Sequence, residues 1–134
     1  MNETLARSIR RATFAARCAV AHVGMTDGPL GAILAALEAY ADSDADELPD
    51  AESIMRSVCR EIAKGRNDWS PAGCRVRGAR YATLRAVQAA LEDAPWGVGE
   101  QTAEDAAVSA TIRVLTNDDP WGGSPELRAF FAAA

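Results

Sequence analysis

The chain has 134 residues and a formal net charge of -5, with 49% hydrophobic and 25% charged residues. These values are typical of one soluble globular domain over residues 1–134, and they exclude collagen-like, low-complexity and disulfide-scaffold proteins. Alanine supplies 29 of the residues counted as hydrophobic. Because alanine combines the best helix propensity with a side chain small enough for close helix packing, the composition favours an all-α bundle over a sheet protein.

Cysteine usage and hydropathy bear on the compartment. Cys18, Cys59 and Cys74 are odd in number and widely spaced, which disfavours a disulfide framework and indicates a reducing environment. The basic stretch 7–11 is not followed by the uninterrupted apolar run of a signal peptide. No segment approaches the roughly 18 apolar residues that cross a bilayer. We therefore expect a cytoplasmic protein without membrane association.

Apolar side chains recur at three- and four-residue steps from the N-terminus onward, which is the period of an amphipathic helix. This pattern predicts a first helix over about 3–23, with Gly24 at the position of a C-terminal cap. The dipeptide Gly28-Pro29 then predicts the start of a second helix, because proline suits the first helical turn. The apolar repeat indicates that this helix ends near Ala41.

A third helix is expected over about 50–64, after an acidic connector. Asp50 would accept hydrogen bonds from the free amides of its first turn, and Gly65 would end it. The side chains expected on its buried face are those of Ile54, Met55, Val58, Cys59 and Ile62.

Ser70-Pro71 predicts the start of a long fourth helix, because serine caps free amides and proline supplies the backbone angle of the first turn. Gly73 and Gly78 are expected to delay or loosen its first turns, since glycine is a poor helix former. One face of this helix is expected to carry Tyr81, Leu84, Val87, Gln88 and Leu91.

Two more helices complete the predicted fold. Thr102 and Asp105 resemble a capping box and begin a fifth helix, whose apolar face carries Val108, Ile112 and Leu115. Ser124-Pro125 begins a short last helix with an aromatic pair near its end. No segment of useful length alternates with a period of two. The sequence therefore predicts an all-α, compact bundle of five to six helices.

Two of the predicted connectors share the pattern D-x-P-W-G, at 93–97 and 118–122. Their spacing, close to one helix plus one loop, is compatible with a duplicated helical hairpin. Most helical repeats are longer, at about 33 to 47 residues per two-helix unit. The alternative, which we prefer, is that proline and glycine separate helices here as they do elsewhere, while the tryptophans pack loops against the bundle.

The acidic connector resembles part of a calcium-binding loop. Asp42, Asp44 and Asp46 occupy the first, third and fifth positions of that pattern, where carboxylates converge on the cation. Glu47 stands where the loop needs glycine, and Ser53 stands where it needs a bidentate glutamate. A solvated acidic loop explains these residues more simply, although the pattern leaves cation binding open.

The cysteines and the single histidine form no compelling zinc or catalytic site. Cys18 and His22 lie four residues apart on one helix, and a zinc set with Cys59 and Cys74 would have to converge from separate helices. No acid is placed to orient the histidine beside a nucleophilic cysteine. We therefore expect no bound metal, no cofactor and no enzymatic activity.

Charge is segregated along the chain. Residues 56–85 contain eight basic and two acidic side chains, whereas residues 92–126 contain eight acidic side chains and one arginine. A basic patch could contact nucleic-acid phosphates. The candidate contacts are Arg75, Arg77, Arg80 and Arg85. These four positions spread around a helix instead of forming one stripe, and pairing with the acidic segments is the alternative.

The function class favoured by the sequence is a small non-enzymatic helical protein that binds another protein, as accessory subunits, inhibitors, immunity proteins and adaptors do. Aromatic side chains in loops and near the C-terminus are the candidate contacts. They are Trp96, Trp121, Phe130 and Phe131. Adjacent helical residues point about 100° apart, so one phenylalanine of the pair is expected to remain available. The alternatives are a nucleic-acid-associated protein using residues 56–85 and an enzyme with an unrecognised site.

Overall fold

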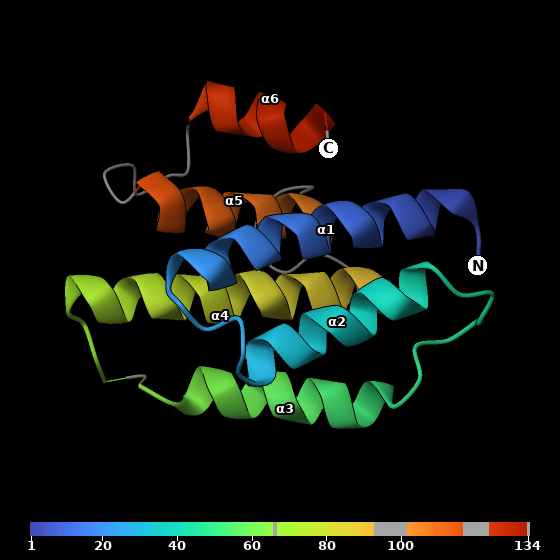
Figure 1. Ribbon diagram of the computed structural model, residues 1–134, viewed down its shortest axis with the longest axis horizontal. Coiled ribbons are helices and arrows are strands. Elements are labelled where there is room, and N and C mark those ends of the chain that lie inside the picture. Colours follow the sequence, from blue (N-terminus) through green and yellow to red (C-terminus); the bar gives the residue numbers. More distant parts are fainter. Residues whose placement is uncertain (66, 93–101, 117–123, 134) are drawn as a thin grey trace.

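Figure 1 shows the computed structural model of the protein, which describes residues 1–65, 67–92, 102–116 and 124–133. Within these ranges the chain forms six α-helices and no strand. The helices are α1 (Glu3–His22), α2 (Pro29–Ala41), α3 (Ala51–Ala63), α4 (Pro71–Ala90), α5 (Ala103–Thr116) and α6 (Pro125–Ala133). The predicted all-α bundle is confirmed. Both D-x-P-W-G segments lie outside the described residues, so neither the duplicated hairpin nor the preferred alternative is tested at these segments.

Successive helices run in alternating directions across the bundle (Figure 1). The long helix α4 lies in the middle and contacts α1, α2, α3 and α5. The short helix α6 lies on the outside, where it contacts α5 and α1. In the described part of the chain, no helix is both long enough and apolar enough to cross a lipid bilayer.

Glycines end two of the helices as predicted. Gly24 has a φ of 73°, its amide donates to the carbonyl of Ala21, and the amide of Met25 donates to the carbonyl of Val20 at 3.0 Å. This pair of bonds is the Schellman motif, which satisfies carbonyls left free at the end of α1. Gly65, with a φ of 63°, follows α3 in the same left-handed conformation.

Side-chain caps begin two of the three helices for which they were predicted. Ser70 Oγ accepts a hydrogen bond from the amide of Gly73 at 3.0 Å, and Thr102 Oγ1 accepts one from the amide of Asp105 at 3.1 Å. The prediction for Asp50 is wrong, because its side chain accepts no such bond. Its backbone is left-handed, with a φ of 56°, whereas a capping side chain requires an extended backbone.

Glycines also allow two close approaches between chain segments. A Cβ on Gly78 would lie 2.5 Å from Cγ2 of Val114, so α4 and α5 come close at this point. A Cβ on Gly31 would clash with the backbone carbonyl of Thr26 in the preceding turn. Gly73 does not delay α4, which begins at its predicted proline. Gly78 therefore allows close packing between α4 and α5, and α4 is helical from Pro71 onward.

Alanine forms much of the core around α4. Five alanines of this helix are buried, namely Ala79, Ala82, Ala86, Ala89 and Ala90. Larger buried side chains come from the neighbouring helices, with Leu34 on α2 and Val58 on α3 among them. Small side chains on the central helix let four other helices pack closely against it.

Of the side chains predicted to be buried on α3, Val58 is buried, and Ile54, Met55 and Ile62 are half-buried against the core. On α4 the predicted face is buried at Leu84, Val87 and Gln88. Cys59 is exposed because it lies about 100° beyond the buried Val58 around α3. The carboxylate of Glu61 is buried instead and pairs with Lys64 Nζ at 2.8 Å. On α4, Tyr81 is 39% exposed, since the buried side of that helix is centred on its alanines.

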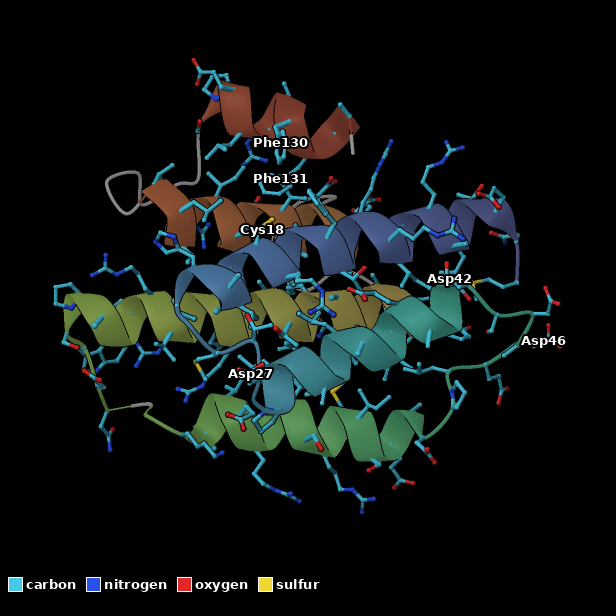
Figure 2. The ribbon with its side chains drawn as sticks, in the orientation of Figure 1. Cys18, Asp27, Asp42, Asp46, Phe130 and Phe131 are labelled. Atoms are coloured by element: carbon cyan, nitrogen blue, oxygen red, sulfur yellow. The ribbon has the colours of Figure 1, made fainter. Side chains whose placement is uncertain are left out.

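A second, smaller cluster attaches α6 to the bundle. The side chain of Phe131, which is 2% exposed, packs with Ala15 of α1 and Ile112 of α5. Figure 2 shows Phe131 between α6 and the helices beneath it. This contact holds the last helix against both α1 and α5.

Candidate functional site

An open groove of about 630 Å³ lies between α1 and α6. It is lined by Glu3, Arg7, Arg10, Arg11, Phe14, Phe130 and Ala133, and we call it the α1–α6 groove. A smaller hollow of about 290 Å³ lies nearby and is also lined by Arg11, together with residues of α5 and α6. The volume of the α1–α6 groove is within the range of ligand-binding pockets.

Helical spacing brings the α1 side of the groove together. Arg10 and Arg11 lie three and four residues after Arg7, and Phe14 lies one further turn along, so all four share one broad face of α1. The buried residues of α1, such as Ile9 and Ala16, lie on the opposite face. The arginines therefore project outward, beside the phenylalanines of α6.

Three phenylalanine rings form the apolar part of the groove and its support. Phe14 lies 5.9 Å from Phe130 and 5.9 Å from Phe131, measured between ring centroids, and the adjacent pair on α6 lies 5.2 Å apart. Phe131 is buried, whereas Phe130 is 54% exposed and Phe14 is 40% exposed. The buried ring thus holds two exposed rings in place at the surface.

The arginines of the groove differ in their partners. Arg10 donates to the backbone carbonyl of Ala41 at 3.3 Å and forms ion pairs with Asp42 at 3.4 Å and Glu3 at 3.5 Å. Arg11 pairs with Glu104 at 3.7 Å, and its buried Nε has no hydrogen-bond partner. Among the described residues, none forms a hydrogen bond or ion pair with exposed Arg7. The groove therefore retains unused donor capacity.

The aromatic residues predicted to bind a partner are placed differently by the structure. Phe130 lines the α1–α6 groove and presents more than half of its surface to solvent. Phe131 belongs to the core, so its contribution to this surface is structural. Trp96 and Trp121 lie outside the described residues, and their role in binding stays a prediction.

Two of the arginines predicted to bind nucleic acid, Arg77 and Arg80, already donate to backbone carbonyls of the segment before α4. Arg77 covers the ring of Trp69 at 4.1 Å and donates to the carbonyls of Gly65 and Asp68. The other three arginines are half-buried, and Arg75 lies near the start of α4. Arg80 donates to the carbonyl of Lys64, and Arg85 donates to the side chain of Gln88. The bonds of Arg77 and Arg80 tie α4 to the segment that precedes it.

The potential metal ligands are also dispersed. Figure 2 shows Asp42 at the end of α2 and Asp46 at the outer tip of the acidic connector. Asp42 pairs with Arg10, and Asp46 lies 3.8 Å from the amino terminus. Across the described ranges, no three histidine, cysteine or acidic side chains are close enough to hold a metal ion.

The three cysteines are free and lie in different environments. Cys59 and Cys74 are exposed, whereas Cys18 lies half-buried beside the small cluster under α6. Burial raises the pKa of the Cys18 thiol, which keeps it protonated at neutral pH. Within the described ranges, no group of three ligands includes these cysteines or His22, so a zinc site is not assembled from them.

Sequence reasoning missed the basic half of the groove. The stretch 7–11 was compared only with the basic start of a signal peptide, which the following residues exclude, and Phe14 was not among the predicted contacts. The signal that could have found them is the recurrence of arginine and phenylalanine on the face of the first helix opposite its apolar stripe. What that face meets depends on where α6 packs, which no local pattern reveals.

Comparison with known protein families, with curated proteins and with solved structures finds no match to this chain. The α1–α6 groove is accordingly the feature on which a function can be argued.

Proposed function

We propose that this protein acts by binding another protein and that the α1–α6 groove is its contact surface. The observation that carries the proposal is the pair of exposed rings, Phe14 and Phe130, beside three arginines in one groove. Aromatic side chains and arginine are enriched where interfaces gain most of their binding energy. Such a surface suits an accessory subunit, inhibitor, immunity protein or adaptor.

The groove is held in shape before any partner arrives. Phe131 fixes α6 against α1 and α5, and the bond of Arg10 to the carbonyl of Ala41 positions one side chain on the rim of the groove. A surface that is already ordered loses less conformational entropy on binding. The proposal is for a non-enzymatic protein of the cytoplasm, and three free cysteines support a reducing compartment.

A nucleic-acid-associated role is the second candidate, and the observation that favours it is Trp69. Its ring is 74% exposed and lies beside Arg77 in the most basic part of the chain. Bases stack on such rings in single-stranded complexes. The intramolecular bonds of Arg77 and Arg80 make this candidate weaker than the groove.

Photo-crosslinking in the native host tests protein binding at the groove. Benzoylphenylalanine is placed at position 130, and a matched variant carries it at position 81, where Tyr81 is exposed on α4. We expect one discrete crosslinked product from position 130 that is absent from position 81. Mass spectrometry then identifies the partner. The same products from both positions, or none from position 130, would contradict the proposal.

A further inference from the structure

We infer that the occupant of the α1–α6 groove is an acidic segment of the partner protein that carries a large apolar side chain. The apolar side chain would contact Phe14 and Phe130, and neighbouring carboxylates would pair with Arg7 and Arg11. This inference rests on the proposed function and adds the chemistry of the partner to it.

The charge of the groove is opposite to that of the whole chain. Three arginines and one carboxylate, that of Glu3, line the groove of a protein whose formal net charge is -5. Asp42 and Glu104 pair with Arg10 and Arg11 from outside the lining, which leaves Arg7 as the arginine whose charge is not offset by an ion pair with a described residue. A local cationic surface on an acidic protein attracts anionic groups and repels cationic ones, which gives specificity as well as a faster encounter. The arginines thus favour a ligand that carries anionic groups.

Two of the arginines have guanidinium donors to offer. Arg7 is exposed and has no hydrogen bond or ion pair with any described residue. Arg11 is 3.7 Å from Glu104, beyond hydrogen-bonding distance, and its Nε is buried without a partner. A buried donor that lacks a partner is unfavourable. The guanidinium of Arg11, which lines the groove and forms no hydrogen bond with a described residue, could donate to a carboxylate entering from the groove.

The apolar half of the groove favours a ligand that has an apolar side chain as well as negative charge. The rings of Phe14 and Phe130 are inclined at 46° with centroids 5.9 Å apart, so a side chain placed against both covers apolar surface that is now exposed. Removing apolar surface from water stabilises a complex. A purely acidic ligand would leave this contribution unused, and a purely apolar one would leave the arginines unpaired.

A protein segment fits these conditions better than a nucleic acid does. A polynucleotide carries a negative charge at every phosphate, so a protein that is acidic overall repels it along its length. A peptide carries only a few carboxylates, which can be positioned opposite the arginines. A second copy of this chain is another possible source of acidic residues, from its connector 42–50. The experiments below distinguish a separate acidic partner from a nucleic acid and from a second copy of this chain.

Selection of random peptides displayed on phage, with the whole protein as target, tests the inference directly. We expect enriched peptides to combine aspartate or glutamate with phenylalanine, leucine or tryptophan. Their affinities are then measured by fluorescence anisotropy, beside a fluorescent oligothymidylate of similar length. Tighter binding of the oligothymidylate, or enrichment of neutral or basic peptides, would overturn the inference.

Charge reversal gives the sharper measurement. Arg7→Glu should weaken binding of an enriched peptide by about tenfold or more, and replacing its acidic residue by lysine should restore binding to this variant. Arg56→Glu, at an exposed position on α3, is the matched control and should retain wild-type affinity. An effect of equal size in both variants would mean that only net charge matters, which contradicts the inference.

A further variant separates this inference from the proposed function. If Phe130→Asp abolishes peptide binding while Arg7→Glu does not, the groove binds proteins but does not select carboxylates, and only the inference fails. If neither variant affects binding, the groove is not the contact surface and both fail. A dimer of the wild-type protein, seen by light scattering and lost in Arg7→Glu, would assign the groove to a second copy of the chain and overturn the inference of a separate partner.

Discussion

Two adjacent phenylalanines show how one helical step divides structure from surface. Phe130 and Phe131 follow each other on α6, yet one is 54% exposed and the other is 2% exposed. The angle of about 100° between neighbouring helical residues is the cause. It turns Phe131 toward Ile112 and leaves Phe130 over the groove.

This division leads to opposite expectations for two alanine substitutions. Phe131→Ala should lower the free energy of unfolding by about 3 to 5 kcal/mol, because it empties a buried site between three helices. Phe130→Ala should lower it by less than about 1 kcal/mol, since most of that ring already faces water. Urea unfolding followed by circular dichroism measures both values. Equal losses would show that both rings are parts of the core.

At the scale of single elements, the ends of the helices depend on a few local bonds. Ser70 and Asp50 are both expected from the sequence to be caps, but only Ser70 accepts a hydrogen bond from a first-turn amide. Asp50 instead holds a left-handed backbone, which glycine adopts without strain. The two positions therefore respond to substitution in different ways.

The expected effects can be compared in one denaturation series. Ser70→Ala should destabilise the protein by about 1 kcal/mol, the usual value of a serine cap. Asp50→Gly should leave stability unchanged or raise it by up to about 1 kcal/mol, because it relieves the left-handed backbone. A loss at Asp50 as large as the loss at Ser70 would show that its carboxylate stabilises α3 in some other way.

Local signals of this kind explain how much of the structure could be predicted. The bounds of α1, α2, α3 and α4 follow from apolar periodicity, Gly24 and Ser70-Pro71, since helix ends are fixed by neighbours in sequence. The groove could not be predicted, because it joins α1 to α6, which are far apart in the chain. The spacing of Phe130 and Phe131 indicated that they would point apart, but which of them is buried depends on tertiary packing.

At the scale of the whole molecule, the excess of negative charge helps to raise the pKa of a buried tyrosine, Tyr40. Tyr40 is 4% exposed at the end of α2, where its hydroxyl donates to the carbonyl of Asp46 at 3.4 Å. Burial raises the pKa of Tyr40 above its usual value of 10.0, and the carboxylates of Glu92, Asp46 and Glu47 raise it further. The folded protein therefore keeps this proton more tightly than the unfolded chain does.

Stability should consequently fall in alkali. The unfolded chain releases the Tyr40 proton at a lower pH than the folded protein does, so the free energy of unfolding decreases as pH rises beyond about 10. The raised pKa of Cys18 adds a decrease that begins above its usual value of 9.0. In urea unfolding between about pH 7 and 11, Tyr40→Phe should flatten this decline. The matched variant Tyr81→Phe, at an exposed phenol, should keep the wild-type decline, and a wild-type slope in Tyr40→Phe would contradict the assignment.

The central position of α4 has a consequence for how the protein is made. Synthesis proceeds from the N-terminus, so α1, α2 and α3 leave the ribosome before the helix against which all three pack. Their apolar faces have no central partner until the chain has been extended through Ala90. The nascent first half is therefore the stage at which chaperones or misassociation compete most strongly with folding. Because α1 and α3 each contact α2 as well as α4, completion of α4 adds the helix that joins all three into one core.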